Sequence, residues 1–203
     1  MADPLVTDPS RYVLPASGRT GLSYLSRTKT ADVVCYLDFD GVLHHEAAYR
    51  HPKRGVYIDP KIAPGHSLFE YAHHLVEAFT PYPDLKIVLS TSWVRVLGYT
   101  RTRKYLPVQL AERVIGATYH SNAHGMSEGY AYQFSSMTRG EQVWADVLRR
   151  QPRRWLAIDD AVDDWPDKLR DNLVPCAGEY GLGDPHTRDV LAQRLVELHQ
   201  LQD

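Results

Sequence analysis

The sequence is poor in the residues that build disulfide-stabilised, zinc-binding or membrane-spanning proteins. Its 203 residues include only two cysteines, Cys35 and Cys176, each inside an apolar run, which is the pattern of buried free thiols. No stretch reaches the roughly 18 consecutive apolar residues of a transmembrane helix. The first residues, MADPLVTDPSRY, carry acids and prolines in place of the basic and then apolar start of a signal peptide. We therefore expect a soluble, cytoplasmic protein.

An excess of basic charge is also absent. The 23 lysines and arginines are balanced by 25 aspartates and glutamates, so any polyanion would have to meet a local basic patch. Hydrophobic residues at 43% and charged residues at 24% are typical of a globular chain, and no repeat or low-complexity tract interrupts them. We expect an irregular extension over residues 1–30 and one domain over residues 31–203, and a chain of this length buries roughly 70% of its unfolded surface.

Short apolar runs alternate with segments of helical periodicity along this domain. The run VVCYL at 33–37 is typical of a strand buried on both faces. Further strands are expected at 86–89, 114–119, 155–158 and 173–176, and helices at 67–79, 107–113, 141–150 and 187–200. Residues 42–64 should form a loop or hairpin, and 121–138 a loop. The alternation predicts an α/β fold with a doubly wound parallel sheet, whose ligands bind beyond the carboxyl ends of the strands.

Two aspartates follow the first strand, in the segment Asp38-Phe39-Asp40-Gly41. Because side chains alternate along an extended chain, the two carboxylates can point into one region, and Gly41 lets the chain turn sharply behind them. Two close carboxylates repel each other unless a cation or a shared proton relieves them. The pair therefore implies a hard metal ion such as Mg²⁺.

Hydroxyl, basic and acidic groups lie near the ends of the later strands. Ser90-Thr91-Ser92 follows the second strand and offers three hydroxyls and exposed amides, which suit phosphate oxygens. Asp159-Asp160 ends the fourth strand. Arg139 lies twenty residues before Asp159, at the start of an expected helix, so its cation could face the same crevice.

With these four groups in this order, the sequence resembles the haloacid dehalogenase (HAD) superfamily of phosphohydrolases, which has a Rossmann-like fold. The Asp-x-Asp-Gly motif, the hydroxyl after a strand, the upstream basic residue and the acidic pair all have counterparts, and the resemblance spans residues 33–176. More narrowly, LDFDGVLHH, IVLSTSW, TRGEQVWADVL and WLAIDD are similar to a group of HAD domains associated with bacterial RNA-repair proteins.

The resemblance implies nucleophilic catalysis by a carboxylate. Asp38 would attack phosphorus and become an aspartyl phosphate, while Asp40 would protonate the leaving oxygen and then deprotonate the hydrolytic water. Mg²⁺ would be bound by Asp38, the backbone carbonyl of Asp40 and Asp159, and Asp160 would bind a metal-bound water or orient a ligand.

Phosphate binding is the other part of this implied site. Ser90, with the neighbouring Thr91, and Arg139 would contact the phosphate oxygens and neutralise their charge. The HAD domains of RNA-repair proteins that the sequence resembles carry an arginine directly after the tryptophan of their second motif. Here Val94 occupies that place and Arg95 comes one residue later, so Arg95 is the corresponding candidate for a substrate contact.

The spacing of the motifs also bears on the substrate. Only 49 residues separate Asp40 from Ser90, which leaves room for a minimal cap, and HAD proteins with little cap accept large substrates. The excursion at 42–64 contains Arg50, Lys53 and Arg54, which could contact the phosphate backbone of a polynucleotide end or form a solvated hairpin.

Three neighbours of the motifs are further candidates for contact with the substrate. His44 and His45 follow the nucleophile loop, so one of them could touch the substrate, and Trp93 could stack on a base. Core packing is the alternative for Trp93.

Three functions remain open on these observations. The first is a Mg²⁺-dependent phosphomonoesterase acting on a large or end-exposed phosphate, such as a nucleic-acid terminus in RNA repair. The second is a capless phosphatase for a phosphoprotein or a small metabolite. The third is a non-catalytic module that binds RNA or protein. The intact pair of Asp38 and Asp40 favours an enzyme over the third function.

Overall fold

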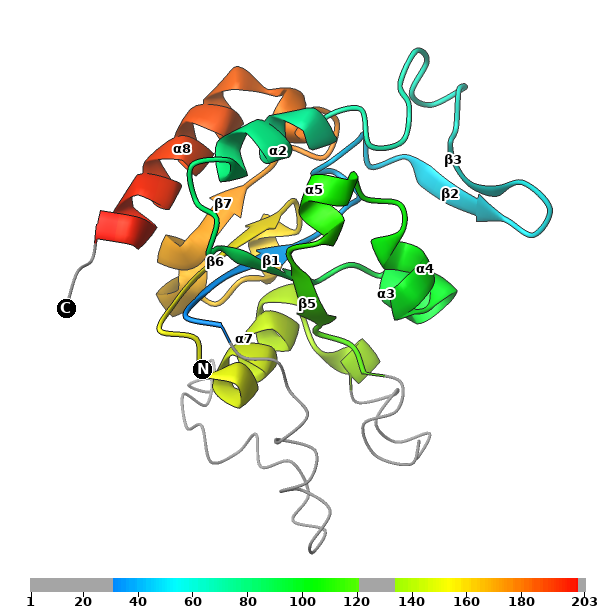
Figure 1. The fold of residues 1–203 in the computed structure, drawn as a ribbon. Helices are drawn as coiled ribbons and strands as arrows, with labels where there is room; N and C mark the ends of the chain where they lie inside the picture. The colour runs from blue at the N-terminus through cyan, green and yellow to red at the C-terminus, as the bar shows by residue number, and fades with distance from the viewer. Residues whose placement is uncertain (1–30, 121–133, 201–203) are drawn as a thin grey trace, which may run out of the picture.

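Five parallel strands form the centre of the computed structural model, which describes residues 31–120 and 134–200 (Figure 1). They lie in the order β5-β4-β1-β6-β7, with every neighbouring pair parallel. Their bounds are β1 Val33–Leu37, β4 Lys86–Leu89, β5 Val114–Ala117, β6 Arg154–Asp159 and β7 Leu173–Pro175. The predicted α/β fold is confirmed. The extension expected over 1–30 and most of the loop expected over 121–138 lie outside the described residues.

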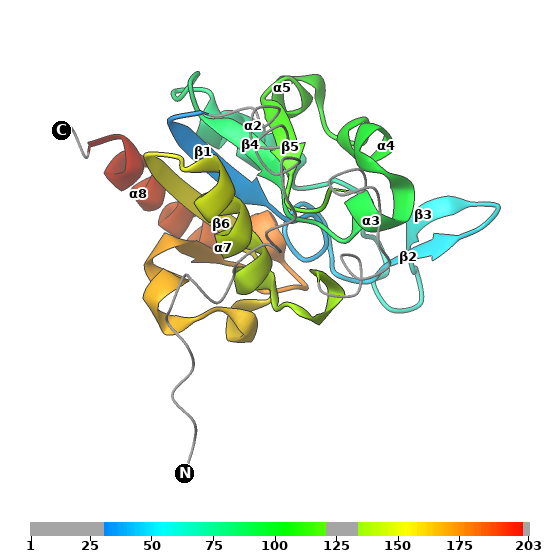
Figure 2. The ribbon, with the colours of Figure 1, turned by 90° about the horizontal axis from the view of Figure 1, so that it is seen from below.

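Helices cover both faces of this sheet. The three longest in the described part of the chain are α2 Ala72–Phe79, α7 Arg139–Arg150 and α8 Pro185–Gln200. Cys35 and Leu37 of β1 share a hydrophobic cluster with residues of α2 and α8, whereas Val34 and Tyr36 share another with residues of α7. Figure 1 shows α2 and α8 on one side of the sheet, and Figure 2 shows α7 in front of the strands on the other. Burial on both faces explains the continuous apolar run of β1.

The helices between the strands differ from expectation in two places. The helix expected from residue 67 begins at Ala72, because Phe69 has a left-handed backbone (φ 60°) that no helix continues through. Two short helices after β4, α3 Trp93–Leu97 and α4 Tyr99–Arg103, were not predicted. Gly98, with φ 83°, separates them and makes the sharp turn without steric cost.

The excursion between β1 and α2 is an antiparallel hairpin. Its strands are β2 Ala48–His51 and β3 Gly55–Ile58, and Tyr49 pairs with Tyr57. The hairpin projects from the body of the molecule in Figure 1. Because it contains the only strands between β1 and α2, where every residue is described, the cap is minimal as predicted.

A capping box sets the start of α7. The Thr138 side chain accepts a hydrogen bond from the Glu141 amide, and the Glu141 carboxylate accepts one from the Thr138 amide at 2.8 Å. The helix therefore begins at Arg139, two residues before its expected start at 141. This places Arg139 in the first turn, at the edge of the sheet where the strands end.

Both cysteines are free and buried, as predicted. Burial raises the pKa of each thiol, which keeps it protonated and unreactive. No helix in the described residues is long and apolar enough to cross a membrane.

A buried ion pair joins α7 to the sheet. Asp146 accepts hydrogen bonds from the Tyr36 hydroxyl of β1 at 3.1 Å and from Arg150 Nε at 2.6 Å, and it also pairs with Arg149. Asp146 and Arg150 are each only 3% exposed. Charges this deeply buried must be paired, so the contact fixes where α7 packs.

Replacing Asp146 with alanine should lower the free energy of unfolding by about 3–5 kcal/mol, because the Tyr36 hydroxyl and the Arg150 guanidinium lose a buried acceptor. Asp167→Ala is the matched control, since its pair with Arg170 is exposed and should contribute less than about 1 kcal/mol. Urea unfolding measures both. Equal stability of the two variants would contradict a structural role for the Asp146 pair.

Candidate active site

The candidate functional residues converge at one edge of the sheet. Asp38 follows β1, Ser90 follows β4, and Asp159 is the last residue of β6. The three strands are neighbours and parallel, so their carboxyl ends meet at the same edge. Arg139, in the first turn of α7, reaches this edge from the face of the sheet that α7 covers.

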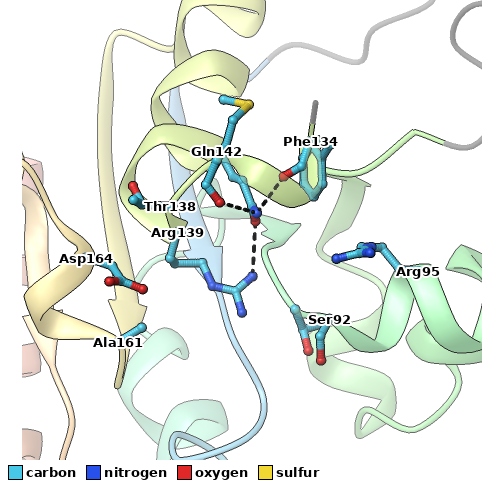
Figure 3. Close-up of a pocket in the computed structure, with 10 residues that line it drawn as sticks. Ser92, Arg95, Phe134, Thr138, Arg139, Gln142, Ala161 and Asp164 are labelled. Carbon is cyan, nitrogen blue, oxygen red and sulfur yellow. Dashed lines mark hydrogen bonds between the residues drawn. The ribbon is translucent and has the colours of Figure 1, made fainter. Parts of the chain in front are cut away.

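A pocket of about 190 Å³ opens beside these strand ends (Figure 3). Arg139 lines it together with Arg95 of α3, and Thr91 and Asp164 also belong to its wall. The full lining is Thr91, Ser92, Arg95, Phe134, Met137, Thr138, Arg139, Gln142, Ala161 and Asp164. Two arginines therefore border a hollow large enough for a phosphate and part of its leaving group, with Arg95 exposed at the rim.

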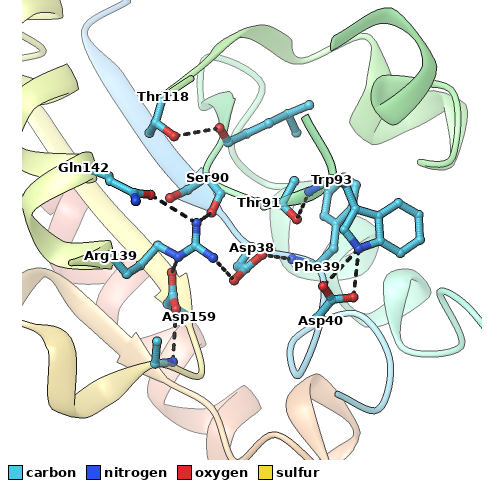
Figure 4. A network of polar contacts seen from close by, with 12 residues as sticks. Asp38, Phe39, Asp40, Ser90, Thr91, Trp93, Thr118, Arg139, Gln142 and Asp159 are labelled. Atoms are coloured by element: carbon cyan, nitrogen blue, oxygen red, sulfur yellow. Dashed lines mark hydrogen bonds and ion pairs between the residues drawn. The ribbon is translucent and has the colours of Figure 1, made fainter. Parts of the chain in front are cut away.

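Arg139 connects the three strand ends (Figure 4). Its Nη2 donates to Asp38 Oδ2 at 3.0 Å, its Nε lies 3.4 Å from Asp159 Oδ2, and its Nη1 donates to the Ser90 carbonyl. One cation thus faces two buried carboxylates. The expected proximity of Arg139 and the aspartates is present in the fold.

Three carboxylates crowd together beside this arginine. Ligand atoms of Asp38, Asp159 and Asp160 all lie within 4.8 Å of one another. Burial raises the pKa of all three acids, and the charge of Asp38 adds to the rise at Asp159 and Asp160. The pKa of Asp160 reaches about 6. A single arginine does not neutralise three carboxylates, so the cluster lacks positive charge.

The donor set fits a hard divalent cation. All three candidate ligands are carboxylates, which suit Mg²⁺. Asp159 Oδ2 is also buried and makes no hydrogen bond within the described residues, so its contact with Arg139 at 3.4 Å leaves it able to accept a metal ion. The Asp40 carboxylate does not belong to this cluster, and only its backbone carbonyl remains a candidate ligand.

The phosphate-binding candidates are placed differently from one another. Ser90 Oγ is buried and has no hydrogen-bond partner within the described residues, so it can donate to a phosphate oxygen. The Ser90 amide is not exposed as expected, because it donates to the Leu37 carbonyl and extends the sheet pairing. Thr91 is 3% exposed, and its hydroxyl accepts a hydrogen bond from the Trp93 amide at 3.4 Å.

Asp40 points away from the acidic cluster, on the opposite side of Asp38 from Arg139 (Figure 4). Trp93 Nε1 donates to both of its oxygens, at 2.8 Å and 3.0 Å, and His44 Nε2 lies 3.1 Å from Oδ1. These contacts were missed from the sequence, where both rings were considered as substrate contacts. Their only signal was their position inside the same motif segments as Asp40 and Ser90.

The basic residues of the hairpin do not join the site. Arg50, Lys53 and Arg54 are exposed on β2 and the turn that follows it, and none of them lines the pocket. Any contact they make with a substrate would be with a part that extends beyond the pocket.

A comparison with protein-family models matches the chain to a HAD domain family. The matching family model is described as the HAD domain in Swiss Army Knife RNA repair proteins, and it covers residues 34–187, which include all four motifs. The chain belongs to this family, so the resemblance noted in the sequence is confirmed. A comparison with curated proteins found no match.

The raised pKa of Asp160 predicts how its removal affects stability. Its ordinary pKa is 3.8 and its pKa in the folded protein is about 6, so its ionisation opposes folding above pH 6 and the penalty disappears as the pH falls toward 4. In metal-free protein, Asp160→Asn should therefore raise Tm by several degrees at pH 7.5, with no gain at pH 4.

Differential scanning calorimetry in EDTA between pH 4 and 8 measures this gain. Asp171→Asn, which changes an exposed aspartate, is the control. A lower Tm of Asp160→Asn at pH 7.5 would show that the Asp160 carboxylate stabilises the fold, which would contradict the prediction that its ionisation opposes folding. Added Mg²⁺ should raise the Tm of the wild type more than that of Asp160→Asn.

Proposed function

We propose that this domain is a Mg²⁺-dependent phosphomonoesterase that works through an aspartyl phosphate on Asp38 and acts on the phosphate at a nucleic-acid end. The observation that carries the proposal is the convergence of Asp38 with Arg139, the unpartnered Ser90 hydroxyl and two further carboxylates. Phosphoryl transfer needs these parts: a nucleophile, donors for the phosphate oxygens and a site for a cation.

Asp38 is suited to the attack on phosphorus. Its Oδ1 accepts a hydrogen bond from the Phe39 amide at 2.7 Å, and its Oδ2 accepts one from Arg139. These bonds hold the carboxylate in one orientation, which lowers the entropic cost of reaction. Arg139 and Ser90 would bind the phosphate oxygens and stabilise the charge that develops on them.

The acidic cluster would complete the site. Asp38 and Asp159 would bind Mg²⁺ with the Asp40 carbonyl, and Asp160 would hold one of its waters or bind it directly. When bound, the cation supplies positive charge that draws phosphate to three carboxylates and polarises it for attack. The shortage of positive charge described above supports this assignment.

A nucleic-acid end is the substrate that best suits the surroundings. The minimal cap leaves the pocket open, so a long chain could extend outward from the reacting phosphate. Arg50, Lys53 and Arg54 lie on the projecting hairpin, and residues 48–58 include no acid. The family of the chain is defined on RNA repair proteins, which supports RNA as the polymer.

Asp38→Asn should abolish phosphate release from terminally phosphorylated oligonucleotides, because an amide is a far weaker nucleophile than a carboxylate. Beryllium fluoride with Mg²⁺ should bind the wild type as a phosphoryl mimic and raise its Tm, but should leave Asp38→Asn unchanged. Phosphopeptides and small phosphate esters tested alongside, with and without Mg²⁺, identify the preferred class. Full activity of Asp38→Asn would overturn the covalent mechanism.

Removing all three hairpin charges, in Arg50→Gln/Lys53→Gln/Arg54→Gln, should raise KM for an oligonucleotide several-fold and leave hydrolysis of a small aryl phosphate unchanged. Each lost phosphate contact should also flatten the salt dependence, by about 0.7 in the log–log slope for a single strand. Arg170→Gln/Arg194→Gln, which removes two partly exposed charges from other elements, is the control.

Measurements of kcat and KM for both substrates across a salt series decide the role of the hairpin. Equal loss on both substrates would indicate a defect in folding or in the active site. No loss on either would leave the three charges as the solvated tip of a hairpin.

A further inference from the structure

We propose that Trp93 and His44 are positioning residues that hold the Asp40 carboxylate from two sides and determine which of its oxygens carries the reactive proton. The inference rests on the proposed function, with Asp40 as the acid and base that the resemblance to HAD phosphohydrolases implies. It assigns a role to two rings that the sequence left as candidate substrate contacts or core residues.

The hydrogen bonds to Asp40 are unequal at its two oxygens. Oδ1 is contacted by Trp93 Nε1 at 2.8 Å and by His44 Nε2 at 3.1 Å, whereas Oδ2 is contacted by Trp93 Nε1 alone, at 3.0 Å. Two ring nitrogens therefore occupy Oδ1. The Asp40 side chain is still 28% exposed, so it remains accessible to a substrate. We infer that Oδ2 is the oxygen that exchanges its proton.

Trp93 and His44 together form a clamp on the Asp40 carboxylate, and His44 is fixed in the orientation that this clamp needs. It is fully buried, and the backbone of Asp40 and His44 forms an isolated parallel bridge across the turn at Gly41, which has φ 67°. Its Nδ1 has no hydrogen-bond partner within the described residues. The tautomer with hydrogen on Nε2 donates to Asp40 and leaves no buried N–H unpaired, so it is the favoured one.

Trp93 is held as firmly by the rings around it. It is 5% exposed, and it packs edge to face against Phe69 and Tyr105, with centroid distances of 5.5 Å and 5.1 Å. Phe69 also lies 4.9 Å from the His44 ring. So little of Trp93 is exposed that it offers almost no face for a nucleic-acid base. Its indole N–H is instead aimed at Asp40, as Figure 4 shows.

The clamp matters because Asp40 acts in both half-reactions. As Asp38 bonds to phosphorus and the bond to the leaving oxygen breaks, that oxygen takes the proton from Asp40 Oδ2. Water then attacks phosphorus, its proton passes to Oδ2, and the bond from phosphorus to Asp38 breaks to release phosphate. Asp40 ends protonated, as it began. The contacts at Oδ1 can persist in both protonation states, so the carboxyl group need not reorient between the steps.

Trp93→Phe tests the clamp, because it keeps an aromatic ring and removes the indole N–H together with part of the buried ring volume. The control is Phe69→Leu, which disturbs the packing of both rings but makes no hydrogen bond to Asp40. On a terminally phosphorylated oligonucleotide, whose alcohol needs a proton to leave, kcat of Trp93→Phe should fall about 10- to 100-fold with KM little changed.

An activated ester separates the two half-reactions. The dinitrophenolate of 2,4-dinitrophenyl phosphate leaves without taking up a proton. Trp93→Phe should therefore form the phosphoenzyme quickly and hydrolyse it slowly. Stopped-flow absorbance should then show a burst of dinitrophenolate approaching one equivalent per protein. Asp40→Asn should show the same burst with a slower steady state. Phe69→Leu, which keeps both ring nitrogens beside Asp40, should lose less kcat than Trp93→Phe and show no burst.

The alternative roles have different outcomes. If Trp93 only stacks on a base, Trp93→Phe raises KM for the oligonucleotide and produces no burst. If it only packs, Trp93→Phe and Phe69→Leu lose activity equally on both substrates. Either result overturns the clamp while the wild type stays an active phosphatase. A wild type inactive on every phosphate ester overturns the proposed function instead, and this inference with it.

His44 provides an independent variant and a readout besides activity. His44→Gln keeps an N–H donor near Asp40 and should retain more kcat on the oligonucleotide than His44→Leu at matched Tm. In ¹⁵N NMR spectra, the Trp93 indole N–H should be shifted downfield and protected from exchange, and both properties should be lost in Asp40→Ala. Equal kcat of the two His44 variants, or an indole signal insensitive to Asp40→Ala, would contradict the clamp.

Discussion

The repulsion among three clustered carboxylates, two of them buried, at the end of the parallel sheet is the constraint on which the rest of the site depends. Asp38, Asp159 and Asp160 meet there because β1 and β6 are neighbouring parallel strands. Arg139 offsets part of this repulsion, and a capping box at the start of α7 holds it in place. The remaining negative charge destabilises the folded protein when the site is empty, and it favours the binding of a cation together with a phosphate.

The two aspartates of one motif have separate environments. Asp38 is 3% exposed and faces Arg139 and the other acids, whereas Asp40 is partly exposed and faces two ring nitrogens. This division suits a reaction in which one carboxylate becomes covalently modified and the other only exchanges protons. Separation of roles by surroundings is the usual way in which neighbouring carboxylates of an active site acquire different functions.

The segment between β1 and α2 contributes a projecting hairpin and no larger cap to the surroundings of the site. HAD family membership fixes the architecture and associates the chain with RNA repair proteins, and the pocket bordered by Arg95 and Arg139 lies at the sheet edge where the strands end. The projecting hairpin carries basic residues away from this pocket. A polymer could meet both at once, whereas a small ester would meet only the pocket.

The sequence by itself determined the sheet, the order of its motifs and the family. Apolar runs buried on both faces are a local signal, and parallel strand ends converge whatever the loops do, so Asp38, Ser90 and Asp159 could be placed together from pattern alone. The late start of α2 and the short helices α3 and α4 were not predictable in this way, because Phe69 and Gly98 adopt backbone conformations that periodicity does not encode. Only the tertiary structure decided that Trp93 and His44 meet Asp40 and that Asp146 pairs with Tyr36 and Arg150 inside the protein. Two of these four contacts join residues far apart in the chain. All four depend on side-chain direction, which only the packing of the surrounding elements determines.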